Sequence, residues 1–115
     1  MGSPKWIVLL ALMLAGCATG KGPEHFYFGS YSEAEKLYNK GQYEPAIEEY
    51  QAYIEENPEG NLAVIAKFYI GKSHAALGHN EEAVSIFKDI VRKNPDLVWA
   101  DFAKNQLAEI EKAKS

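Results

Sequence analysis

Residues 37–58, LYNKGQYEPAIEEYQAYIEENP, and residues 74–95, HAALGHNEEAVSIFKDIVRKNP, align with each other at a constant separation of 37 positions. Glycine, alanine, aromatic residues and proline recur at matching places in both, as at Gly41 and Gly78. Recurrence at such a period is typical of repeat proteins, in which each unit is one small supersecondary structure packed against the next. We therefore expect a stack of similar units.

The apolar residues within each unit recur at the spacing of one face of an α-helix. In the first unit this face comprises Ala46, Ile47, Tyr50, Tyr53 and Ile54, and the second unit repeats it 37 positions later. The pattern therefore predicts an all-α domain.

Local signals predict where the helices begin and end. Gly41 ends a helix, because glycine accepts the left-handed conformation of a helix C-cap. Pro58 stops the next one, because the residue before proline avoids helical geometry. Ser30 and Glu33 form a capping box, which predicts that the first helix begins at Ser30. We expect five helices, at 30–40, 44–57, 61–77, 81–94 and 97–113.

This pattern resembles the tetratricopeptide repeat, a pair of antiparallel helices in about 34 residues. The family's small, glycine, alanine, aromatic and proline positions correspond in the first unit to Ala34, Gly41, Ala46, Tyr50 and Pro58. The resemblance covers residues 30–113 and implies a short antiparallel helix-pair solenoid of two repeats plus a capping helix.

Some positions depart from the family pattern. Asn80 stands where the family usually has tyrosine, and Lys67 stands where it has an early tryptophan. The period is also about three residues longer than usual. In this longer spacing the chain is similar to repeats of bacterial envelope proteins such as the Tol–Pal-associated coordinator and the lipoprotein of the outer-membrane β-barrel assembly machine.

The first seventeen residues differ in composition from the rest of the chain. Residues 1–5 carry one lysine, residues 6–14 are apolar and residues 15–17 are small. This order is typical of a secretory signal peptide. The apolar run is about half of the 20 residues that a membrane-spanning helix needs.

The four residues that end this segment, LAGC, resemble the lipobox of bacterial lipoproteins, in which a peptidase cuts before the cysteine. The resemblance implies that residues 1–16 are a lipoprotein signal peptide and that Cys17 carries a covalent lipid. Glycine, proline and small residues after Cys17 predict a flexible tether, so residues 17–29 are expected to be the lipidated cysteine and this tether. Two or three acyl chains anchor a protein firmly. Because no aspartate follows Cys17, the same resemblance implies export to the outer membrane, with the domain facing the periplasm; in a Gram-positive source the same anchor would lie on the outer face of the only membrane. The alternative is a plain export signal with a chance cysteine.

The sequence offers no pattern of an active site or a metal centre. His74 and His79 are five positions apart, out of phase with paired helical ligands, and the glutamate pairs fit solvated helix faces. The net charge of −4, with acids and bases interspersed, argues against a nucleic-acid partner. We predict no enzyme activity, no catalytic residue, no metal and no cofactor except the lipid on Cys17.

The tetratricopeptide resemblance instead implies a role in protein binding, because the first helix of each pair lines a peptide-binding groove in that family. Carrying these groove positions across gives nine residues: Tyr31, Glu35, Tyr38, Asn39, Ile65, Phe68, Lys72, Phe102 and Asn105. The aromatic members are the expected anchors, because aromatic residues dominate binding energy at interfaces. The alternative for each of these residues is a place in the core.

We therefore predict a membrane-anchored adaptor that binds a protein or peptide of a bacterial cell-envelope assembly. A second hypothesis is a structural subunit that self-associates or packs on a larger lipoprotein complex. A third is a cell-wall glycan binder, whose exposed tyrosines stack on sugars.

Overall fold

The structure is a computed structural model that describes residues 22–114, with side chains from residue 29 onward. Within this range it contains five α-helices and no strand. The helices are α2 (Gly22–Asn39), α3 (Tyr43–Glu56), α4 (Asn61–Ala76), α5 (Asn80–Lys93) and α6 (Val98–Lys114). The predicted all-α fold is confirmed. The predicted signal peptide and Cys17, the predicted site of lipid attachment, lie outside the described residues.

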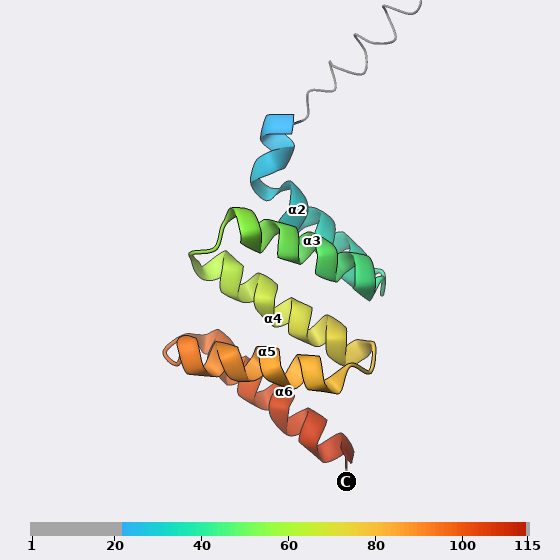
Figure 1. Cartoon of the computed structure of the whole chain (residues 1–115), viewed down its shortest axis with the longest axis vertical. Coiled ribbons are helices and arrows are strands. Elements are labelled where there is room, and N and C mark those ends of the chain that lie inside the picture. The colour runs from blue at the N-terminus through green and yellow to red at the C-terminus, as the bar shows by residue number, and fades with distance from the viewer. Residues whose placement is uncertain (1–21, 115) are drawn as a thin grey trace, which may run out of the picture.

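Each helix packs against the next one in the chain, and the helices form a single stack (Figure 1). The α2–α3 and α4–α5 turns lie at one edge of this stack, and the α3–α4 and α5–α6 loops lie at the other. α2, α4 and α6 are thus the first helices of successive units, with α4 also contacting α6. No helix among residues 22–114 is long and apolar enough to span a membrane.

The first helix begins eight residues before the start that the capping box predicts. α2 begins at Gly22, and Pro23 occupies its first turn, where the missing N–H needs no acceptor. Ser30 and Glu33 consequently lie inside α2, so the prediction that they open it is wrong. Residues 22–29 of the predicted tether are helical.

The two turns within the repeats have the same geometry. Gly41 has a φ of 78°, in the left-handed region that favours glycine. The N–H of Gln42 donates to the carbonyl of Leu37 at 2.9 Å, which closes the helix end as in a Schellman motif. The same arrangement recurs at Gly78, whose φ is 85°. Glycine therefore ends the first helix of each pair, as the sequence predicts.

The core consists of two clusters of buried side chains, the first formed by α2, α3 and α4 and the second by α4, α5 and α6. Tyr50 and Phe87, which occupy the equivalent aromatic position, are 1% and 0% exposed. The buried members of the first cluster are Ala34, Ala46, Ile47, Tyr50, Tyr53, Ala66 and Ile70. Those of the second are Phe68, Ala83, Phe87, Ile90, Ala103 and Ile110.

α6 ends the described stack as a cap. Ala100, Ala103 and Ile110 are buried on one side of this helix. Lys104 and Ala108 are exposed, although Ala34 and Gly71, which correspond to Ala108 in the earlier repeats, are both buried. The difference arises because no helix among the described residues follows α6 and covers that side.

Candidate protein-interaction surface

Five aromatic side chains form a continuous row across the first helices of the units. We call Tyr38 of α2, Phe68 and Tyr69 of α4, and Trp99 and Phe102 of α6 the aromatic strip. The Tyr38 and Tyr69 ring centroids are 5.1 Å apart, and Tyr69 lies 6.2 Å from Trp99. Trp99 lies 5.1 Å from both Phe68 and Phe102. Most of these pairs meet edge to face, a favourable geometry for aromatic rings.

Exposure increases toward the α6 end of the strip. Tyr38, Tyr69 and Trp99 are half-buried, whereas Phe102 is 41% exposed. Val98, one turn before Phe102 in the same helix, is 54% exposed. Because the half-buried rings hold Phe102 in place, the α6 end presents an apolar surface that is already ordered before any partner binds.

One predicted anchor belongs to the core instead. Phe68 is only 5% exposed, and its ring lies 5.5 Å from Phe87 and 5.1 Å from Trp99. α6 and its tryptophan cover the ring, which matches the core alternative for Phe68, and contact of Phe68 with a partner stays a prediction. Within the strip, the buried ring of Phe68 lies 6.3 Å from the exposed ring of Phe102 and supports it from the core side.

The other predicted groove residues lie at or near the surface. Tyr31 is half-buried and packs edge-on against Tyr50 and Tyr53 of α3, at 5.7 and 5.4 Å, so it is not part of the strip. Glu35, Asn39 and Asn105 are exposed, and Ile65 and Lys72 are half-buried. Contact of these side chains with a partner stays a prediction.

Sequence reasoning missed Tyr69 and Trp99. Trp99 lies three positions before Phe102, and residues three apart share a helix face, so this spacing could have revealed it. Tyr69 follows Phe68 directly and has no comparable signal. Its position depends on how α4 packs between α2 and α6.

Tyr31 and Tyr38 are uncharged at neutral pH. Burial raises the pKa of Tyr31 to about 12, and the nearby carboxylate of Glu35 acts in the same direction. Burial also raises the pKa of Tyr38, with a smaller contribution from Tyr43. The phenol groups therefore offer a hydroxyl group to a partner and not a negative charge.

Residues 66–96, which include α5 and most of α4, match the tetratricopeptide repeat family. This stretch of the chain is therefore similar to one tetratricopeptide repeat. This repeat coincides with the second unit of the structure and ends next to Pro95, as the sequence alignment of the two units predicts. No curated protein and no solved structure gives a significant match.

The two histidines of the α4–α5 turn approach each other, with Nδ1 of His74 lying 3.3 Å from Nδ1 of His79. Burial lowers the pKa of His74; Glu82 opposes this shift and His79 adds to it. The described residues contain no group of three or more His, Cys, Asp or Glu side chains that could hold a metal ion.

Proposed function

We propose that this protein is a membrane-anchored adaptor that binds another protein of a bacterial cell envelope through the α6 end of its aromatic strip. The observation that carries this proposal is the pair Val98 and Phe102, the exposed large apolar residues of the described chain. They lie next to the ordered rings of Trp99 and Phe68. Tetratricopeptide repeats serve as protein-interaction modules, and this supports an adaptor.

The neighbouring polar residues give the surface a means of selecting its partner. Asn105 is exposed one turn after Phe102, and Lys72 is half-buried one turn after Phe68. An amide and an ammonium beside an apolar anchor fix the register of a bound peptide through hydrogen bonds. A partner segment with an apolar side chain near an acidic one therefore fits this end of the strip.

The membrane anchor in this proposal rests on the sequence around Cys17. A diacylated or triacylated cysteine would tether the domain at the membrane surface with enough apolar chain for stable binding. The test is incorporation of labelled palmitate by the wild-type protein and by Cys17→Ser. Label in the wild type alone supports the anchor, and an unlabelled wild type contradicts it.

Crosslinking in cells tests the adaptor role. A photoreactive residue replaces Phe102 in the full chain, and the adducts are identified by mass spectrometry. The matched control carries the same residue at Glu48, which is exposed on α3. We expect a heterologous envelope protein at position 102 that is absent at position 48. No adduct above the control contradicts the adaptor role.

Self-adducts at position 102 would favour the second hypothesis, a structural subunit. The same exposed pair of Val98 and Phe102 supports this alternative, because a second copy could cover it. Sedimentation of the full chain in a non-ionic detergent separates the two, since only the structural subunit forms a defined oligomer without a partner. Glycan binding has less support, because the tyrosines with described side chains are all buried or half-buried.

A further inference from the structure

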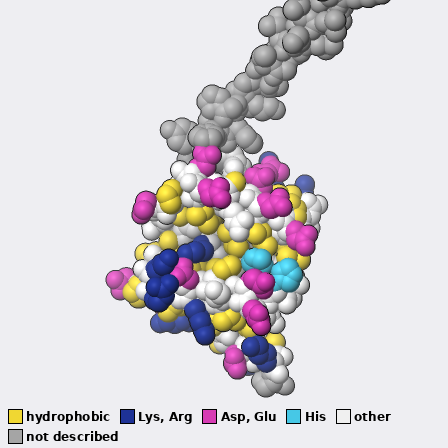
Figure 2. All heavy atoms as spheres, in the orientation of Figure 1, with side chains coloured by type: hydrophobic (Ala, Val, Ile, Leu, Met, Phe, Trp, Pro, Cys, Tyr) yellow, Lys and Arg dark blue, Asp and Glu magenta, His cyan; other side chains and the backbone are white. Residues whose placement is uncertain are grey.

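Lysine and arginine side chains from α4 and α5 surround the carboxylate of Asp89, which belongs to α5. Nζ of Lys67 donates a hydrogen bond to Asp89 at 2.5 Å. Arg92 lies 2.5 Å from the same carboxylate and Lys93 lies 3.5 Å from it. Lys88 lines the hollow beside them. We call these four cations the basic patch, and Figure 2 shows lysine and arginine side chains gathered in this way at one side of the molecule.

The patch is strongly positive for an acidic protein. Three cations paired with one carboxylate, together with Lys88 in the hollow beside them, give a local charge of +3, whereas the whole chain carries −4. The hydrogen bond from Lys67 holds the pKa of Asp89 below its ordinary value, and the neighbouring cations add to this shift against a smaller opposing effect of burial. Asp89 therefore stays ionised and holds the side chains of Lys67, Arg92 and Lys93 in place. Because these side chains are already ordered, they lose less conformational entropy when an anion binds.

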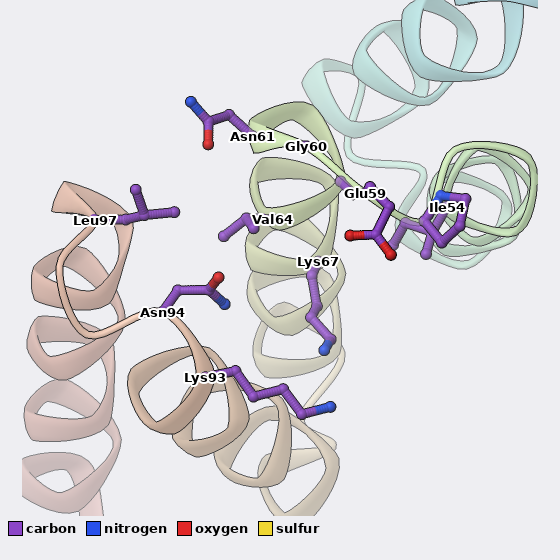
Figure 3. Close-up of a pocket in the computed structure, with 11 residues that line it drawn as sticks. Ile54, Glu59, Gly60, Asn61, Val64, Lys67, Lys93, Asn94 and Leu97 are labelled. Atoms are coloured by element: carbon purple, nitrogen blue, oxygen red, sulfur yellow. The ribbon is translucent and has the colours of Figure 1, made fainter.

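Two hollows flank Lys67. The first, with a volume of about 360 Å³, lies between the α3–α4 and α5–α6 loops. Its apolar wall includes Val64 and Leu97, and Figure 3 shows Lys67 and Lys93 extending toward the same side of it. The second, of about 510 Å³, is lined by Ile86 and by three cations of the basic patch, Lys67, Lys88 and Arg92. Each hollow thus combines a cation with an apolar contact.

We infer that the basic patch binds an acidic segment of a partner protein, in which glutamate or aspartate residues alternate with apolar ones. The carboxylates would pair with the ammonium and guanidinium groups, and the apolar side chains would enter the two hollows. The patch shares no residue with the aromatic strip. The inference therefore does not rest on the proposed function and adds a second contact surface to it.

The surroundings of the patch favour a narrow ligand over an anionic membrane. Glu59 lines the first hollow beside Lys67 and Lys93. A flat anionic surface over the hollow would bring this carboxylate close to lipid phosphates, whereas an extended peptide can avoid it. Nucleic acid fits less well, because none of the residues that line the two hollows is aromatic and able to stack on a base.

The test is binding of a fluorescein-labelled peptide of alternating glutamate and leucine, followed by anisotropy with the full chain in a non-ionic detergent. We expect binding that weakens as salt is added, because screening reduces attraction between exposed charges. The variant Lys88→Glu/Arg92→Glu should raise Kd about tenfold or more. The matched control, Lys40→Glu/Lys104→Glu, changes two exposed lysines outside the patch and gives the same net charge. It should leave Kd nearly unchanged.

Three results would overturn the inference. One is an equal loss of affinity in both variants, which would mean that only net charge matters. Another is equal affinity for a peptide of alternating glutamine and leucine. The third is binding to phosphatidylglycerol vesicles in preference to the peptide, which would make the patch a lipid contact. Circular dichroism checks the fold, and Lys88→Gln/Arg92→Gln replaces the charge-reversal variant if that variant unfolds.

Discussion

A Cβ atom on Gly71 would lie 2.8 Å from Cε1 of Phe87, well inside the contact distance of two carbon atoms. Gly71 belongs to α4 and Phe87 to α5, and the Phe87 ring is fully buried. The missing side chain of Gly71 therefore sets how closely the two helices of the second repeat approach.

Replacing Gly71 by alanine should lower the free energy of unfolding by about 1–2 kcal/mol. The added methyl group forces Phe87 and Ile86 to shift, and the better helix propensity of alanine offsets only part of this overpacking. Urea unfolding followed by circular dichroism measures the change. Ala108→Leu enlarges the equivalent but exposed position of α6 and should stay within about 0.5 kcal/mol of wild type. Equal effects of the two variants would contradict this role of Gly71.

Alanine variants of Phe68 and Phe102 should have different effects, the first mainly on the stability of the fold and the second mainly on partner binding. Phe68→Ala removes a ring that is 5% exposed and should destabilise the fold by about 3 kcal/mol or more. Phe102→Ala removes a ring that is 41% exposed and should cost less than about 1 kcal/mol. We expect Phe102→Ala nevertheless to lose most of the partner adduct formed by a photoreactive residue at Val98. Retention of that adduct would show that Phe102 is not an anchor.

Tyr31 should titrate late in the folded protein. Its pKa rises from 10.0 to about 12, so the unfolded chain loses this proton at lower pH than the folded chain does. The stabilising contribution of Tyr31 is complete below pH 10 and is lost as the pH rises through about 12. This titration is followed by the absorbance of tyrosinate as a function of pH, recorded for wild type and for Tyr31→Phe, and the difference between the two curves isolates Tyr31. A difference curve centred near the ordinary pKa would mean that the ring is not buried against α3.

Acidification should weaken the fold through His74. Its pKa is lowered by burial, so the unfolded chain binds this proton more readily than the folded chain does. The stabilising contribution of His74 is present above the ordinary pKa of 6.5 and is lost as the pH falls through the folded value. The urea concentration at the unfolding midpoint should be measured at a pH above and at a pH below this titration range. The difference between the two midpoints should be larger for wild type than for His74→Gln. The same pH dependence in both proteins would assign it to other groups.

Asp89→Asn should lower the free energy of unfolding by about 1 kcal/mol, a value typical of partly exposed ion pairs. The substitution leaves Lys67, Arg92 and Lys93 facing one another without their shared anion. Because the pKa of Asp89 is lowered, this contribution is present above 3.8 and declines as the pH falls through the folded value. Asp96→Asn, at an exposed loop position, is the control and should change little. An equally stable Asp89→Asn would show that the cations do not depend on it.

The sequence by itself determined the repeat and the limits of four helices. α3, α4, α5 and α6 begin and end within one residue of the bounds that glycine, proline and apolar spacing predict. These signals work because glycine and proline act on the backbone within a few residues of themselves. The start of α2 was missed because Ser30 and Glu33 form a capping pattern that also fits inside a helix, whereas Pro23 marks the actual first turn.

Only the tertiary structure decided which side chains face a partner. The sequence predicts that both Phe68 and Phe102 line the groove, but α6 covers the first and leaves the second exposed. Lys67 and Asp89 are 22 positions apart, and the interspersed charges of the sequence become a basic patch only where α4 and α5 pack together. Burial and charge grouping depend on which helix lies against which, and no local backbone preference specifies that.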